Sequence, residues 1–132
     1  MTYLADTHVL VWAITDPEKL SPKVTGILES PDTHIMVSAV SFWEISMKYA
    51  LGKLLLENIK PEDFPSLSAE TGFESLPLSV EMYATYHQLN AAFHKDPFEK
   101  MLIWQAKCLK IPILSKDQKI RQYKSEGVSV IW

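Results

Sequence analysis

An apolar strand runs directly into an apolar helix in the stretch Thr2-Tyr3-Leu4-Ala5-Asp6-Thr7-His8-Val9-Leu10-Val11-Trp12. The residues up to Ala5 have the composition of a buried strand, and the apolar residues Val9, Leu10 and Trp12 that follow have helical spacing. Asp6 stands at the junction between the two elements. Because open parallel sheets bind their ligands beyond the carboxyl ends of the strands, Asp6 is the first candidate for a functional residue.

The rest of the chain repeats this alternation of strands and helices. Further strands are expected at residues 34–37, 73–78, 111–114 and 128–131. Helices are expected after Ser21-Pro22 and at residues 41–49, 61–72, 80–93, 96–110 and 118–123. Strands that alternate with helices need crossover connections, so the sequence predicts the α/β class, with a mainly parallel sheet between two layers of helices.

Composition limits the kind of protein further. The 132 residues, 47% of them hydrophobic, suit one domain, and no apolar run is long enough to span a membrane. A net charge of −3 argues against a protein that coats nucleic acid, but acids that hold metal ions would contribute to it. No secretory signal is expected, because Asp6 and His8 interrupt the first apolar run, and the single cysteine, Cys108, fits a reducing cytoplasm.

Acidic side chains follow several of the expected strands. Asp117 comes after the strand at residues 111–114, and Glu44 is expected on the first turn of the helix after the strand at 34–37. Asp96 and Glu99, three residues apart on one helix face, begin the helix that leads into the strand before Asp117. In a parallel sheet, all of these acids would lie at the same end as Asp6.

Each acid also has a purely structural explanation. N-capping would explain the acids that begin helices, namely Asp6, Asp96 and Asp117. Glu44 and Glu99 have the spacing of capping-box partners, three residues after Ser41 and Asp96. The functional interpretation therefore depends on the acids lying together and not on any one of them.

Glu44 gives the strongest indication of a cation. It lies in the apolar stretch Phe42-Trp43-Glu44-Ile45-Ser46-Met47, where burial of an unpaired carboxylate would be costly. Several carboxylates that converge also repel one another unless a cation lies between them. Oxygen ligands of this kind favour Mg²⁺ or Mn²⁺ over zinc, so the sequence predicts a divalent-cation site.

Four segments resemble, in order, the motifs of PIN-domain ribonucleases, and specifically of the VapC-type toxins of bacterial toxin–antitoxin pairs. They are Leu4-Ala5-Asp6-Thr7-His8-Val9-Leu10-Val11-Trp12, Ser38-Ala39-Val40-Ser41-Phe42-Trp43-Glu44-Ile45-Ser46-Met47-Lys48 with Leu51-Gly52-Lys53-Leu54, His94-Lys95-Asp96-Pro97-Phe98-Glu99-Lys100-Met101-Leu102-Ile103 and Ile113-Leu114-Ser115-Lys116-Asp117. The resemblance covers essentially the whole chain. Four motifs with matching order and spacing are a specific signal, where one alone would be weak.

The resemblance implies a single PIN-like α/β/α domain over residues 1–132 that hydrolyses RNA with Mg²⁺ or Mn²⁺. Its catalytic and metal-binding residues would be Asp6, Glu44, Asp96, Glu99 and Asp117. It also implies a homodimer and a VapB-like antitoxin that covers the site. One residue departs from the family pattern: Glu99 stands where this subgroup usually has aspartate, so the metal geometry can shift and Asp96 can take more of the ligand work.

Other residues are candidates for supporting roles. Thr7 and Ser115 are expected to orient carboxylates or a metal-bound water, with turn or capping roles as the alternative. Lysines near the acids in sequence are candidates for contacts with RNA phosphates, with an ordinary solvated surface as the alternative: Lys48, Lys95 and Lys116 first, then Lys53, Lys100 and Lys119. Lys48 is favoured because it lies one helical turn beyond Glu44.

Two other functions remain open from the sequence. A phosphotransferase with Asp6 as nucleophile would generally need a second acid two residues later, and that position is His8. A catalytically weak or inactive PIN-like module would keep the acids as helix caps and act through partner binding, and Glu99 is the residue that favours it. Measured Mg²⁺ or Mn²⁺ binding separates this module from the enzyme.

Overall fold

A computed structural model describes residues 1–90 and 96–132 of the chain. Its centre is a five-stranded parallel sheet with the strand order β3-β2-β1-β4-β5. The strands are β1 (Thr2–Ala5), β2 (His34–Ser38), β3 (Glu74–Leu76), β4 (Ile113–Leu114) and β5 (Val130–Ile131). Ala5 pairs with both Val37 and Leu114, so the three central strands end at the same edge of the sheet.

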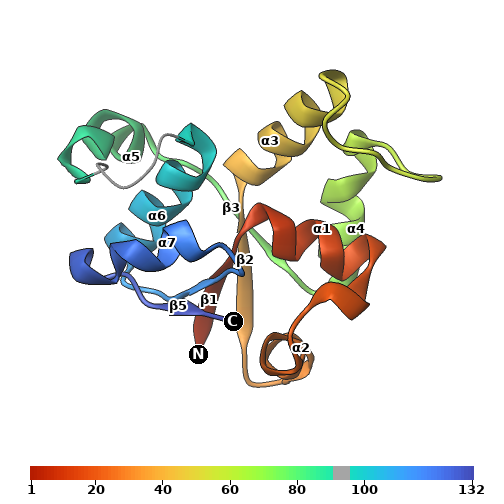
Figure 1. Ribbon diagram of the computed structural model, residues 1–132, viewed down its shortest axis with the longest axis horizontal. Helices are drawn as coiled ribbons and strands as arrows, with labels where there is room; N and C mark the ends of the chain where they lie inside the picture. Colours follow the sequence, from red (N-terminus) through yellow and green to blue (C-terminus); the bar gives the residue numbers. More distant parts are fainter. Residues whose placement is uncertain (91–95) are drawn as a thin grey trace.

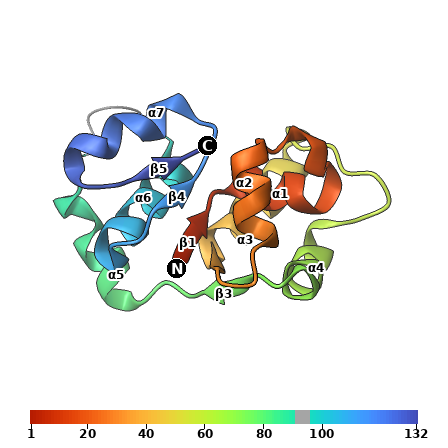
Figure 2. The same ribbon diagram turned by 90° about the horizontal axis from the view of Figure 1, so that it is seen from below.

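Helices cover both faces of this sheet. They are α1 (Thr7–Thr15), α2 (Pro22–Glu29), α3 (Ala39–Ala50), α4 (Phe64–Thr71), α5 (Val80–Thr85), α6 (Pro97–Leu109) and α7 (Gln118–Arg121), with short 3-10 helices at Pro17–Lys19, Pro61–Asp63, Tyr86–Gln88 and Gln122–Glu126. Figures 1 and 2 show α1, α2 and α4 on one side of the sheet and α5, α6 and α7 on the other, with α3 rising from the end of β2. In the described part of the chain, every helix is too short or too polar to span a bilayer.

Alternation along the strands separates two hydrophobic cores. Tyr3 and Ala5 of β1 pack with the helices on one face, whereas Leu4 between them packs with those on the other. The first core includes Val9 of α1 and the second includes Leu102 of α6. A strand that is apolar on both faces needs cover on both sides, which confirms the predicted α/β/α sandwich with a parallel sheet.

The beginning of α3 differs from the prediction. Ser38, not Ser41, is the N-cap, and its side chain accepts a hydrogen bond from the Val40 N–H at 3.1 Å. The helix begins at Ala39, so Glu44 lies in its second turn and is not a capping-box partner of Ser41. Strand β2 extends to Ser38, and the first serine that follows the strand's apolar residues takes the cap position.

Several other elements are shorter than predicted, and the strands expected at residues 73–78 and 128–131 are reduced to Glu74–Leu76 and Val130–Ile131. The strand expected at residues 111–114 begins only at Ile113, because Pro112 has no N–H to donate to a neighbouring strand. The helix expected at residues 80–93 ends at Thr85, and after a 3-10 turn the backbone is already extended at Leu89. The last part of that prediction, residues 91–93, lies outside the described residues.

The buried centre of β1 provides a test of the fold. Leu4 is fully buried in the core between the sheet and α6. We expect Leu4→Ala to lower the free energy of unfolding by about 2–5 kcal/mol, because it removes apolar contacts and leaves a cavity. Leu55→Ala is the matched control: Leu55 is 88% exposed, so its loss should change stability by less than about 0.5 kcal/mol. Urea unfolding followed by circular dichroism measures both, and equal effects would contradict the fold.

Candidate functional site

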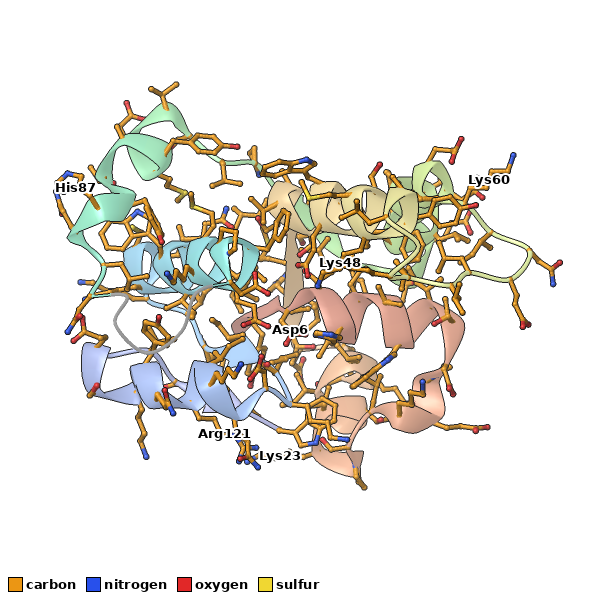
Figure 3. All side chains as sticks on the ribbon, turned by 45° about the horizontal axis from the view of Figure 1, so that its top comes forward. Asp6, Lys23, Lys48, Lys60, His87 and Arg121 are labelled. Carbon is orange, nitrogen blue, oxygen red and sulfur yellow. The ribbon has the colours of Figure 1, made fainter. Side chains whose placement is uncertain are left out.

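The carboxyl edge of the sheet collects the acids that the sequence singles out. Asp6 follows β1, Glu44 lies on the helix after β2, and Asp117 follows β4, while Asp96 and Glu99 begin α6. In Figure 3, Asp6 lies near the centre of the molecule, and Lys48 reaches toward it from α3. The parallel sheet thus brings acids from distant parts of the sequence to one place.

Asp6 is held rigidly where β1 becomes α1. Its side chain is buried, and its Oδ1 accepts a hydrogen bond from the Val9 N–H at 2.8 Å as the N-cap of α1. Burial raises the pKa of the Asp6 carboxyl above its usual range, and the hydrogen bonds from Ser115 and Val9 only partly oppose the rise. A nearby cation would lower the pKa of such a carboxyl group, because a cation stabilises its charged form.

Glu44 is buried and is held by two side chains, those of Thr7 and Lys48, with Ser41 behind Thr7. The Thr7 hydroxyl donates to Glu44 Oε1 at 2.7 Å, and Ser41 Oγ lies 2.9 Å from Thr7 Oγ1. Lys48, one turn further along α3, forms an ion pair with Glu44 Oε2. The ion pair offsets part of the cost of burying the carboxylate, and the hydroxyls fix its orientation.

Asp96, Glu99 and Asp117 form the other side of the cluster. Asp96 is the N-cap of α6 and accepts from the Phe98 and Glu99 N–H groups at 2.9 and 3.2 Å. Asp117 is the N-cap of α7, and its own N–H donates to Ser115 Oγ at 3.0 Å. Burial, the hydrogen bond with Asp117 and the charges of the neighbouring acids together raise the pKa of the Glu99 carboxyl to about 9.

These acids form one electrostatic group. The charges of Asp117, Asp96 and Glu44 all act on Glu99, and the charge of Glu44 also acts on Asp6. Three of the five are N-caps, as the structural explanation predicted, but capping occupies only part of a carboxylate's capacity to accept hydrogen bonds. The same residues can therefore cap helices and also belong to the acid cluster.

The donor set fits a hard divalent cation, because it consists of carboxylate oxygens backed by hydroxyl groups. Among residues 1–90 and 96–132, no three of the acids already stand close enough to hold one ion. The hydrogen bond between Glu99 and Asp117 and the ion pair between Glu44 and Lys48 engage oxygens that a metal would take. A proton and an ammonium group thus balance part of the charge that a cation would balance.

The candidate lysines lie in different settings. Burial lowers the pKa of the Lys48 ammonium, but the hydrogen bond and charge of Glu44 outweigh it and the net shift is upward, so Lys48 stays charged inside the cluster. Lys116 is exposed beside Asp6 and Asp117, where it can reach a phosphate. Lys95 lies outside the described residues. Contacts of these lysines with RNA stay predictions.

Thr7 contacts the carboxylate of Glu44, and Ser115 contacts that of Asp6. These contacts are needed for a role in orienting the carboxylates, and the role itself stays a prediction. The structure adds Ser41 to this network, although the sequence pointed to it as a helix cap. No site role follows from the sequence for Trp12, yet it lines a cavity together with Asp6 and Asp117. The sequence signal that could have identified Trp12 is its position on the helix that Asp6 caps.

The fold and the acids together define an α/β domain with a carboxylate cluster at the carboxyl edge of a parallel sheet. The sequence matches the PIN domain family over residues 3–126, which is nearly all of its length. The chain therefore belongs to the PIN-domain family. A comparison with curated protein sequences gave no significant match.

Solved structures with the same fold cover nearly the whole chain. The VapBC2 complex of Rickettsia felis bound to a promoter DNA fragment matches with a TM-score of 0.69 and 17% identity, over 100% of this chain and 99% of that one. The DNA-bound VapBC of Salmonella typhimurium matches with a TM-score of 0.67 and 14% identity, over 99% and 97%. The PIN domain endonuclease Utp24 matches with a TM-score of 0.54 and 14% identity, over 98% and 82%.

The raised pKa of Glu99 predicts how the metal-free protein responds to pH. Between about pH 4.5 and 9 the unfolded chain loses the Glu99 proton while the folded chain keeps it, so stability should fall as pH rises. Glu99→Gln should flatten this dependence without abolishing it, because burial also raises the pKa of Asp6. Thermal unfolding in EDTA across this range measures the effect. An unchanged slope in Glu99→Gln would contradict the arrangement of the acids.

Because Thr7 donates a hydrogen bond to Glu44, we expect Thr7 to influence metal binding without being a ligand itself. Thr7→Val keeps the shape of the side chain but removes the donor, and losing such a supporting contact typically weakens metal affinity about 10- to 100-fold. Thr15→Val is the control, because Thr15 is on the same helix and its hydroxyl donates to the Val11 carbonyl and not to an acid of the cluster within the described residues. Calorimetric titration with Mg²⁺ and Mn²⁺ should show weaker binding for Thr7→Val alone; equal affinities in both variants would exclude this role for Thr7.

Proposed function

We propose that this chain is a metal-dependent endoribonuclease, the VapC-type toxin of a toxin–antitoxin pair, that acts as one domain in the cytoplasm. The observation that carries the proposal is the convergence of five carboxylates from four segments at the carboxyl edge of the sheet. Such a cluster is suited to a divalent cation. Membership of the PIN-domain family and the order of the four motifs support nuclease chemistry at that cluster.

Asp6, Glu44, Asp96, Glu99 and Asp117 are the residues that would hold Mg²⁺ or Mn²⁺. The bound cation would activate a water molecule and stabilise the charge that develops on the scissile phosphate. The chain itself positions the carboxylates: Val9 and Ser115 hold Asp6, and Thr7 holds Glu44. The Lys48 ammonium, which pairs with Glu44, is the group of α3 that would contact a phosphate.

An antitoxin and a second copy of this chain are the proposed protein partners. The similar solved structures from Rickettsia felis and Salmonella typhimurium are complexes of VapBC, which supports a VapB-like antitoxin. Exposed apolar side chains, including Trp43 at 60% and Val80 at 78%, support surfaces that a partner covers. Light scattering of the purified chain measures the homodimer, and a monomer at all concentrations would contradict it.

Cleavage of RNA tests the proposed activity. The purified protein is incubated with transfer, ribosomal and messenger RNAs in Mg²⁺, Mn²⁺ or EDTA. Metal-dependent cleavage that leaves a 5′ phosphate and a 3′ hydroxyl is expected, and Asp6→Asn should reduce it at least about 100-fold, because the substitution removes a buried negative charge that would bind the metal. Asp32→Asn makes the same chemical change in an exposed turn and should retain activity.

A folded wild-type protein that binds the metal but cuts none of these RNAs would contradict a general ribonuclease. The second candidate, a catalytically weak or inactive module, is favoured by one observation: Lys48 already pairs with Glu44, and Glu99 already shares a hydrogen bond with Asp117. If neither Mg²⁺ nor Mn²⁺ binds at millimolar concentration, these internal contacts have replaced the metal and the module is the better description.

A further inference from the structure

Two aromatic rings lie beside the acid cluster and have no part in the proposed metal chemistry. His8 and Trp12 are one turn apart on the same face of α1, and their ring centroids are 5.7 Å apart. A cavity of about 240 Å³ is lined by Asp6, His8, Trp12, Lys116 and Asp117. A smaller cavity of about 90 Å³ borders the same two rings on the side of Glu44 and Lys48. The two rings therefore border both the cavity that Asp6 and Asp117 line and the cavity beside Glu44.

The Trp12 ring is accessible from solvent. Trp12 is half-buried, and its ring meets that of Trp132 edge-on with centroids 6.1 Å apart. The ammonium groups of the exposed side chains Lys19 and Lys116 lie over the Trp12 ring, 5.8 and 5.9 Å from its centroid. Trp12 packs in part against the first core, and the part of its ring that the two exposed lysines reach is open to a ligand.

We propose that His8 and Trp12 form a stacking platform for one unpaired nucleobase of the RNA, next to the phosphate that lies at the acids. This inference rests on the proposed ribonuclease function and adds to it a preference for single-stranded RNA with a stacked base beside the cleavage site. Asp6 and Asp117 line the same cavity, so a base on Trp12 belongs to a nucleotide adjacent to the scissile phosphate. Aromatic side chains bind the bases of single strands by stacking in this way, and Lys116 supplies a positive charge for the backbone at the same cavity.

The charges around the ring favour a nucleotide over a cationic side chain of a protein partner. Two ammonium groups already lie at the ring, that of Lys116 and that of Lys19, which also pairs with Asp16 at 3.7 Å, so a further cation would compete with them for the same aromatic face. A nucleotide brings a flat base for the ring and a phosphate for Lys116, which is exposed at the same cavity. A base-paired helix would not offer a free base face, which restricts the ligand to unpaired RNA.

RNA binding by the full chain tests the platform. Fluorescence anisotropy measures the affinity for a short oligoadenylate and for a ribose-phosphate oligomer of the same length without bases. Ca²⁺ replaces Mg²⁺ so that binding is measured without cleavage. It binds oxygen ligands but does not share the octahedral geometry of Mg²⁺. Trp12→Ala should lose about 10- to 100-fold in affinity for oligoadenylate and little for the oligomer without bases, because only the stacking is removed.

Three further variants distinguish stacking from a structural role. Trp12→Phe keeps an aromatic face and should retain most of the preference for oligoadenylate. Trp43→Ala removes another exposed tryptophan, which packs against Phe98 with ring centroids 5.0 Å apart and does not line the cavity, so its base preference should equal that of the wild type. His8→Ala, at an exposed position, should give a smaller base-dependent loss and replaces Trp12→Ala if that variant fails to fold.

The outcomes separate this inference from the nuclease function. If Trp12→Ala weakens binding of both oligomers equally, or of neither, the platform is excluded while RNA binding by the wild type still supports the nuclease. A wild type that binds the two oligomers equally well also excludes it. If the wild type binds neither oligomer and cleaves no RNA, both the platform and the proposed function are wrong. A base-dependent loss in Trp12→Ala and His8→Ala, with rescue by Trp12→Phe, supports the platform.

Discussion

Repulsion among carboxylates at one edge of a parallel sheet is the constraint on which the site depends. Asp6 and Glu44 are both buried, and Glu99 is affected by the charges of three other acids. Charges of the same sign would drive these segments apart if nothing compensated them. The chain compensates with the Lys48 ammonium, with a proton retained on Glu99, and with hydroxyl and N–H donors. These contacts engage the carboxylate oxygens that the proposed divalent cation would take.

The sheet and the helix caps couple the site to the fold. Asp6, Asp96 and Asp117 each satisfy N–H groups at the start of a helix, so the residues that would hold the metal also fix the direction of the chain. A structural role and a chemical role are therefore not alternatives for these residues. Replacing one of them affects both local stability and metal affinity, which is why Thr7, a contact of Glu44 that caps no helix, separates the two effects more cleanly.

Local pattern was sufficient for the strands and for most helices. The strand at Thr2–Ala5 and the parallel arrangement follow from apolar runs that alternate with helical periods. The start of α3 could not be read this way, because Ser38 and Ser41 both have the residue type of an N-cap and only the length of β2 decides between them. The shortened β4 reflects Pro112, and the helix expected at residues 80–93 ends early at Thr85.

The sequence by itself determined the fold class and singled out the five acids, with Asp6, Glu44 and Asp117 on segments that follow strands and Asp96 and Glu99 at the start of a helix, because these depend on residue type and on the two periodicities of secondary structure. Only the tertiary structure decided how the acids interact: that Glu99 bonds with Asp117, and that Glu44 pairs with Lys48. It also decided that Trp12, half-buried against the first core, lines a cavity together with Asp6 and Asp117. Those facts depend on distances between segments that are far apart in the chain. Tertiary packing sets these distances, and the local sequence pattern holds no information about them.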